Sequence, residues 1–117
     1  DTGSCMIVVA TDAPLDARQL TRIARRAVFA LARTGASYSH GSGDYAIAFS
    51  TRPAAGPTVA DAALGPLFEA VLDGVEEAVL NSLLAATTTT GHRGRTAEAL
   101  PTDLLLTTLA TPPVDRR

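Results

Sequence analysis

The residue best suited to nucleophilic chemistry is Ser4, which follows Gly3 and stands just before an apolar run. A serine hydroxyl needs a base to become a nucleophile, and cleavage of the Gly3–Ser4 bond would expose an α-amino group on the same residue. With a pKa of about 7.7–8.0, that group would be roughly one-third neutral at about pH 7.5. We therefore predict that Ser4 is an N-terminal nucleophile, with Gly3 allowing the strained geometry of self-cleavage. The alternative is a serine that only begins a strand.

A second pair of candidates stands in the glycine-rich loop of residues 40–44. Ser42 and Asp44 are two residues apart at the start of a strand, so an extended backbone would point both side chains to one side. There they could orient the Ser4 amino group and stabilise its protonated form. The alternative is a turn in which both side chains accept hydrogen bonds from local backbone N–H groups.

Other side chains with suitable chemistry are given simpler roles. Cys5 stands inside the apolar run and is interpreted as a small core residue. His40 is interpreted as an exposed loop residue rather than a base, and His92 as part of a polar turn. All ten basic residues are arginine, so this chain cannot supply the lysine of a Ser–Lys dyad, a Schiff base or a phosphate-binding loop.

A short apolar run rich in β-branched residues predicts a strand at residues 5–11, and a second strand is predicted at residues 45–51. Side chains alternate across a strand. One face of the first strand is therefore expected to carry Ser4, Met6 and Val8, and the other face Cys5, Ile7 and Val9. Two strands and two helices predict an α/β fold, but they are too few for a self-contained sheet. We therefore expect this chain to be one part of a larger α/β sandwich.

The two helices are predicted from caps and apolar spacing. A capping box of Asp16 and Gln19 begins the first helix, and Gly35 ends it. The second helix is predicted from near Pro66 to about residue 86. Apolar stripes at helical spacing are formed by Leu20, Ile23, Ala24, Ala27, Val28 and Leu31 in the first helix and by Phe68, Val71, Leu72, Val75, Val79 and Leu83 in the second.

Charged residues lie largely off these stripes. On the first helix they are Arg18, Arg22, Arg25, Arg26 and Arg33. We interpret these arginines as a solvated or interface-facing surface, with anion binding as the alternative. The acidic residues of the second helix are expected to be exposed or paired with arginines of another element; they are Glu69, Asp73, Glu76 and Glu77.

The C-terminal part of the chain is predicted to contain a polar turn region at residues 87–95 and a last short helix or strand at residues 104–109. Residues 111–117 are predicted to be a flexible tail. Residues 1–3 are assigned to a remnant upstream of the cleavage bond, and residues 4–110 to a portion of one domain.

Composition narrows the class of protein. At 117 residues the chain is one domain at most, and with 46% hydrophobic residues and a mean hydropathy of +0.17 it carries more apolar surface than one small domain hides. A partner chain is therefore expected. A net charge of −2 argues against nucleic-acid binding, and no apolar run approaches the ~20 residues of a membrane span.

The compartment is inferred from processing and cysteine usage. The missing initiator Met suggests a processed product, and the start lacks the basic region and apolar length of a signal peptide. A single cysteine excludes an internal disulfide framework and a Cys-based zinc site, and favours a reducing compartment. We expect the cytoplasm and leave the periplasm open because the precursor N-terminus is missing. We expect no metal or organic cofactor.

Several ordered motifs resemble one known family. They are TGS at 2–4, IVVATDAPL at 7–15, QLxRxARR at 19–26, LARTG at 31–35, HGSGD at 40–44, AFST at 48–51, EEAVLNSLLAA at 76–86 and EALP at 98–101. Over nearly its whole length the chain is similar to the C-terminal (β) subunit of the L-aminopeptidase D-amidase/D-esterase family. That family includes the bacterial β-peptidyl aminopeptidases.

The resemblance implies a fold, a partner and site residues. The fold is an αββα sandwich shared with ornithine acetyltransferases and completed by a larger α chain from the same precursor, and αβ units assemble as tetramers. The precursor cleaves itself at a Gly–Ser bond, which falls on Gly3–Ser4, and the new N-terminal serine is the nucleophile. The supporting serine and acid fall on Ser42 and Asp44, where some members carry Glu. Residues of the oxyanion hole and substrate pocket would come from the α chain.

The expected function is that of a self-processing N-terminal-serine aminopeptidase or amidase. It would release the N-terminal residue of small peptides, amides or esters through an acyl-enzyme on Ser4. Two alternatives stay open. One is an acyltransferase related to the ornithine acetyltransferases, and the other is an uncleaved, non-catalytic structural subunit.

Overall fold

A computed structural model describes residues 3–52 and 56–111. The chain divides into two compact units, Asp1–Val79 and Leu80–Arg117. None of the described helices is long and apolar enough to cross a membrane.

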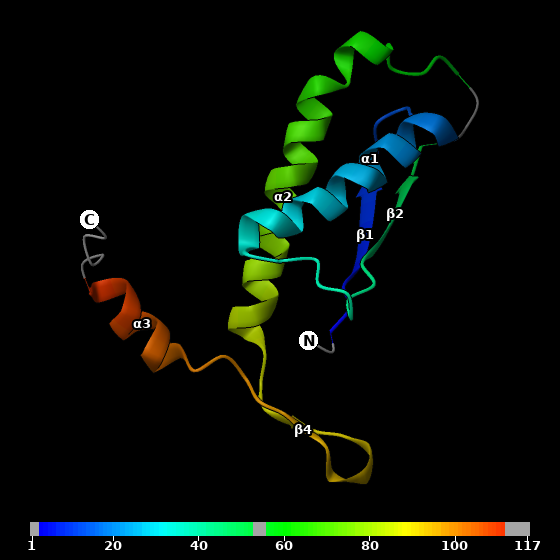
Figure 1. Ribbon diagram of the computed structural model, residues 1–117. Helices are drawn as coiled ribbons and strands as arrows, with labels where there is room; N and C mark the ends of the chain where they lie inside the picture. The colour runs from blue at the N-terminus through cyan, green and yellow to red at the C-terminus, as the bar shows by residue number, and fades with distance from the viewer. Residues whose placement is uncertain (1–2, 53–55, 112–117) are drawn as a thin grey trace. The chain divides into compact units, whose positions relative to one another are not determined.

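The first unit is built on a pair of parallel strands (Figure 1). Strand β1 covers Met6–Thr11 and strand β2 covers Tyr45–Ser50, with Met6 opposite Tyr45 at one end and Thr11 opposite Ser50 at the other. Both predicted strands are therefore confirmed to within one residue. Parallel strands need a crossover connection, and helix α1, Ala17–Ala30, provides it.

The local signals that begin and end α1 act as predicted. The Asp16 carboxylate accepts a hydrogen bond from the Gln19 N–H at 2.7 Å, and the Gln19 side chain accepts one from the Asp16 N–H at 3.1 Å. After α1 the chain tightens into a 3₁₀ turn, Leu31–Thr34, and Gly35 follows with a φ of 90°. This left-handed conformation is accessible to glycine at no steric cost. The capping box and the stop are both confirmed.

The core of the first unit lies between one face of the strand pair and the helices. Helix α2, Gly65–Ala85, follows a 3₁₀ turn at Asp61–Ala63. Alanines of α1 and Val75 of α2 form a buried cluster, against which side chains of both strands and of α2 pack: Ile7, Val9, Ala46, Val71, Leu72 and Val79. The predicted alternation of side chains along β1 is thus confirmed, and the face of Ile7 and Val9 is the one that packs on the core.

The opposite face of the strand pair is apolar and open. Its large side chains are exposed by 44–77%; they are Met6, Val8, Tyr45, Ile47 and Phe49. Alternation along each strand places them away from α1 and α2. A sheet face of this kind is normally covered by another layer.

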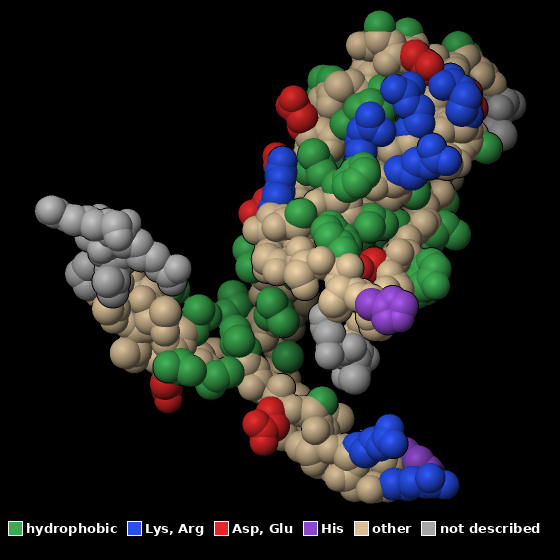
Figure 2. Space-filling model, in the orientation of Figure 1, with side chains coloured by type: hydrophobic (Ala, Val, Ile, Leu, Met, Phe, Trp, Pro, Cys, Tyr) green, Lys and Arg blue, Asp and Glu red, His purple; other side chains and the backbone are tan. Residues whose placement is uncertain are grey.

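The arginines of α1 face neighbouring elements rather than bulk water alone. Figure 2 shows them gathered over α1. Arg18 donates two hydrogen bonds of 2.8 Å to Asp61, and the guanidinium of Arg26 lies 3.4 Å from the centre of the Phe68 ring. Arg33, in the turn after α1, pairs with Asp73 at 2.6 Å and Glu76 at 3.2 Å. The pairs of Arg33 with Asp73 and Glu76 confirm the prediction that acidic residues of the second helix pair with arginines of another element.

The second unit has no buried residue among those described, Leu80 to Thr111. Two-residue strands β3, Thr89–Thr90, and β4, Thr96–Ala97, form a hairpin closed by a 3₁₀ turn, His92–Gly94. Sequence analysis predicted the turn but not its strands, because a run of four threonines has no alternating pattern. The segment left open as helix or strand is helix α3, Thr102–Ala110. Residues 112–117 of the predicted tail lie outside the described residues.

Leu83, the last residue of the apolar stripe predicted for the second helix, is 46% exposed, and its neighbours Leu80 and Leu84 are 46% and 55% exposed. These residues belong to the second unit, where no described element covers them.

Candidate active site

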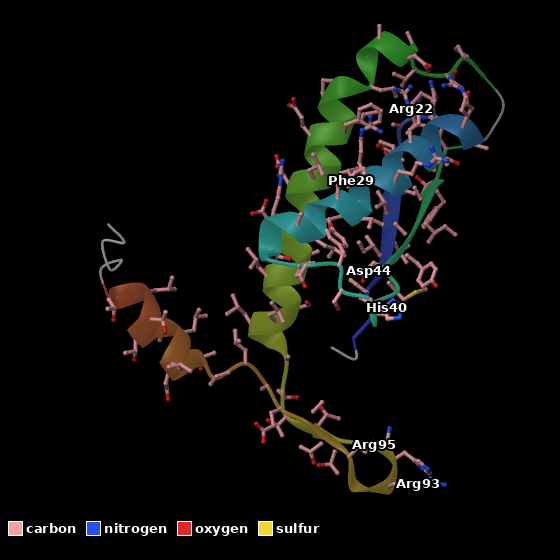
Figure 3. All side chains as sticks on the ribbon, in the orientation of Figure 1. Arg22, Phe29, His40, Asp44, Arg93 and Arg95 are labelled. Carbon is pink, nitrogen blue, oxygen red and sulfur yellow. The ribbon has the colours of Figure 1, made fainter. Side chains whose placement is uncertain are left out.

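The candidate residues meet at the end of the strand pair where β1 and β2 begin. Because the strands are parallel, the segments that lead into them arrive at the same edge. Figure 3 shows Asp44 and His40 at this end, beside the start of β1. There the Gly43 N–H donates a hydrogen bond of 3.1 Å to Ser4 Oγ. Ser4 is exposed, whereas Ser42, Gly43 and Asp44 are half-buried.

Asp44 links the two strands through its side chain. Its Oδ1 accepts a hydrogen bond of 3.0 Å from the Cys5 N–H, and the Ser42 hydroxyl lies 3.1 Å from each carboxylate oxygen, to which it donates. The Tyr45 N–H donates to the Cys5 carbonyl at 2.9 Å. In a regular parallel ladder, the Cys5 N–H would donate to the Gly43 carbonyl. The Asp44 carboxylate takes the place of that carbonyl as the acceptor of the Cys5 N–H, and the Gly43 N–H donates to Ser4 Oγ on the same edge.

The structure thus brings Ser4, Ser42 and Asp44 to one edge of the strand pair. Ser4 Oγ accepts from the Gly43 N–H, and Asp44 accepts from the N–H of Cys5, the residue after Ser4. Asp44 and Cys5 are 39 residues apart, so this pair does more than close the local turn that was the alternative prediction. The catalytic roles of the three residues remain predictions. The contact between Gly43 and Ser4 was not predicted from the sequence. The one feature of the sequence that could have indicated it is the position of Gly43 between the candidate residues Ser42 and Asp44.

The two histidines have the exposed surroundings that were predicted for them, whereas Cys5, predicted as a core residue, is not among the buried residues of the core. His40 is exposed in the loop, and His92 is exposed in the hairpin turn of the second unit. Cys5 is a half-buried free thiol. Its backbone N–H donates to the Asp44 carboxylate and its carbonyl accepts from the Tyr45 N–H, so its backbone is bonded to the start of β2. Within the described parts of the chain, no group of three His, Cys, Asp or Glu residues could hold a metal ion.

Comparison with known proteins gives a consistent result. Residues 1–97 match peptidase family S58. The chain is 41% identical over 109 residues to the beta-peptidyl aminopeptidase BapA of Sphingosinicella microcystinivorans, covering 85% of this chain and 28% of that protein. A second beta-peptidyl aminopeptidase BapA, from Sphingosinicella xenopeptidilytica, is 37% identical over 116 residues, covering 90% of this chain and 29% of that protein.

Solved structures confirm the fold class. The L-aminopeptidase D-Ala-esterase/amidase of Ochrobactrum anthropi, described as a prototype of the serine aminopeptidases and a variant of the Ntn hydrolase fold, superposes with a TM-score of 0.76 at 36% identity, over 89% of this chain and 32% of that one. The chain therefore has an α/β fold of this type. It spans less than a third of the length of the relatives it matches.

Proposed function

Because the chain belongs to peptidase family S58, we propose that it is the C-terminal segment of a hydrolase that cuts itself between Gly3 and Ser4. Ser4 then acts as an N-terminal nucleophile that releases the first residue of small peptides, amides or esters. The observation that carries this proposal is the contact of Ser4 Oγ with the Gly43 N–H, beside the Ser42–Asp44 pair. The choice of substrate class is supported by the aminopeptidase and amidase names of the relatives.

The proposed reaction uses one residue as both nucleophile and base. As Ser4 Oγ attacks the substrate carbonyl, its proton passes to the Ser4 amino group. Collapse of the tetrahedral intermediate breaks the scissile C–N bond, and the leaving amine takes that proton. Water, deprotonated by the same amino group, then attacks the ester on Oγ. The C–Oγ bond breaks, the proton returns from the amino group to Oγ, and the product acid leaves. No metal or organic cofactor is required.

Ser42 and Asp44 are proposed to support the amino group when it carries the extra proton. The Asp44 carboxylate is held one residue from Ser4 by its bond with the Cys5 N–H. A carboxylate near an amino group favours the protonated form of that group. The Ser42 hydroxyl fixes the orientation of the carboxylate by donating to it.

An intact Gly3–Ser4 bond would block this chemistry because the nitrogen would be an amide. Gly3 and Ser4 are both exposed, and a Cβ built on Gly3 meets no atom within 4 Å. Both residues that flank the bond are therefore accessible in this chain.

The remainder of the enzyme is proposed to be an α chain from the same precursor. The open face of the strand pair, formed by Met6, Val8, Tyr45, Ile47 and Phe49, supports this partner, because it is apolar and lies next to Ser4. We propose that a second sheet from the α chain packs on it, completing an αββα sandwich, and that αβ units assemble further. The oxyanion-hole donors would come from that chain.

The nucleophile is tested with Ser4→Ala in the full-length precursor. We expect a single band on a denaturing gel and a loss of amidase turnover of more than about 10³-fold. Ser37→Ala, which removes the same hydroxyl from an exposed loop position, is the matched control and should give two bands and full activity. Two bands from Ser4→Ala would exclude Ser4 as the self-cleaving residue.

The mass of the mature wild-type chain is the companion measurement. We expect the active enzyme to begin at Ser4. An active enzyme with an intact Gly3–Ser4 bond would contradict the proposed base. Transfer of the acyl group to an added amine faster than to water would assign a transferase instead.

A further inference from the structure

We propose that Gly43 is a positioning residue for Ser4, an inference that rests on the proposed function. Its N–H donates to Ser4 Oγ, and a Cβ on its α-carbon would crowd the ring of Tyr45. The two observations are independent, because one concerns a hydrogen bond and the other a steric contact.

The hydrogen bond from the Gly43 N–H determines which lone pair of Ser4 Oγ is left to attack the substrate. A serine hydroxyl has one proton and two lone pairs. The Gly43 N–H, at 3.1 Å from Oγ, occupies one lone pair, and the proposed amino group accepts the proton. The remaining lone pair is the one that attacks. Donation from an N–H also favours the oxygen as it loses its proton, because a hydrogen bond to the charged form stabilises that form.

The Gly43 peptide is fixed by its neighbours on both sides. On one side, the Ser42 N–H donates to the Ser39 carbonyl at 2.9 Å. On the other, Asp44 and Tyr45 each bond to the backbone of Cys5, at 3.0 and 2.9 Å. The N–H is therefore aimed by the strand pair itself, which gives Ser4 Oγ a rigid donor before substrate binds.

Space, rather than backbone conformation, explains why residue 43 is glycine. Its φ lies outside the left-handed region, unlike those of Gly35, Gly56 and Gly94. A Cβ at residue 43 would lie 3.2 Å from Cε2 and 3.3 Å from Oη of Tyr45, closer than most real Cβ contacts. Either the ring or the Gly43 peptide would have to move. In the proposed assembly the α chain covers the face that carries Tyr45, so the peptide moves and the hydrogen bond to Ser4 is lost.

The experiment compares four variants of the full-length precursor after processing: Gly43→Ala, Tyr45→Ala, the double variant and Gly74→Ala. Gly74 is the matched control, because a Cβ there meets nothing within 4 Å. Values of kcat and KM are measured with an amino-acid amide, and rates are divided by the number of sites acylated by an ester titrant.

We expect Gly43→Ala to lower kcat by roughly 10- to 100-fold, because a small misplacement of reacting groups has effects of this size. KM should change by less than about twofold, since ground-state binding is untouched. Removing the ring should rescue the defect, so that kcat of the double variant returns to within about threefold of Tyr45→Ala. Gly74→Ala should match the wild type.

Wild-type kcat in Gly43→Ala would overturn the inference, and so would a double variant that is folded but no faster than Gly43→Ala. If Gly43→Ala fails to fold or process, recovery of both in the double variant supports the steric part of the proposal, and failure of both overturns it. Failure of the proposed function is a separate result. It would appear as turnover in Ser4→Ala, whereas an inactive Ser4→Ala with a fully active Gly43→Ala rejects only the role of Gly43.

Discussion

Two aspartates in the first unit accept several hydrogen bonds each, but from donors of different kinds. Asp44 accepts from the Cys5 N–H and the Ser42 hydroxyl, which are neutral. Asp61 accepts from the guanidinium groups of Arg18 and Arg22, and from the side-chain amide of Gln19. Both carboxylates connect segments that are far apart in sequence, so both contribute to the fold.

The difference lies in what happens to the negative charge. Hydrogen bonds from Arg18 and then Gln19 hold the pKa of the Asp61 carboxyl well below its usual range. The negative charge of Asp61 is paired with the positive charges of Arg18 and Arg22. The ion pairs formed by the described residues leave Asp44 out. An anion held by neutral donors can still stabilise a cation that appears beside it. We infer that Asp61 serves the fold and Asp44 the proposed chemistry.

The largest expected effect is on turnover, from Asp44→Asn. The asparagine keeps an oxygen for the Cys5 N–H, so the fold should remain, but the negative charge is lost. We expect kcat to fall by about 100-fold, measured by amide hydrolysis, with an unchanged melting temperature. Asp12→Asn, at an exposed position, controls for loss of a charge. Wild-type rates in Asp44→Asn would reduce Asp44 to a residue that ends the strand ladder.

The next effect is on stability, from Gln19→Met. Gln19 is 1% exposed, and its amide nitrogen donates to the Val59 carbonyl at 2.7 Å and to Asp61 at 2.9 Å. Methionine has a similar shape but removes both hydrogen bonds and the one that Gln19 accepts from the Asp16 N–H. Asp61 keeps its arginine donors, whereas the Val59 carbonyl loses the Gln19 donor, and we expect a loss of about 1–3 kcal/mol of unfolding free energy. Urea denaturation measures the loss, and turnover per active site should not change. Slower turnover in Gln19→Met with unchanged stability would contradict the assignment of Asp61 to the fold and Asp44 to the chemistry.

The smallest expected effect is a pH-dependent one, from Asp61→Asn. Because the folded-state pKa of Asp61 lies below its ordinary value of 3.8, its contribution to stability is present above that value and is lost as the pH falls below it. The wild type should therefore melt at a higher temperature than Asp61→Asn from about pH 5 upward, and the difference should shrink toward pH 3. Because these side chains are partly exposed, added salt should also reduce it. An equal difference at both pH values would show that the charge is not responsible.

Several features of this protein were determined by the sequence alone. Three of them are the capping box of Asp16 and Gln19, the helix stop at Gly35 and the alternation of side chains along β1. Each depends on residues within a few positions of one another, so each can be recognised from the sequence. The family resemblance selected Ser4, Ser42 and Asp44 as candidates. The hairpin of residues 89–97 was missed because threonine runs carry no such pattern.

Only the tertiary structure decided which distant groups meet. The contacts of Ser4 with Gly43 and of Cys5 with Asp44 each span 39 residues, and that of Arg18 with Asp61 spans 43. Both contacts at the site follow from the parallel register that sets Met6 opposite Tyr45. Register depends on how both strands pack against α1 and α2, and no local pattern encodes it. For the same reason, the sequence placed Asp44 near the site but could not show that its carboxylate accepts from the Cys5 N–H or that the Gly43 N–H donates to Ser4 Oγ.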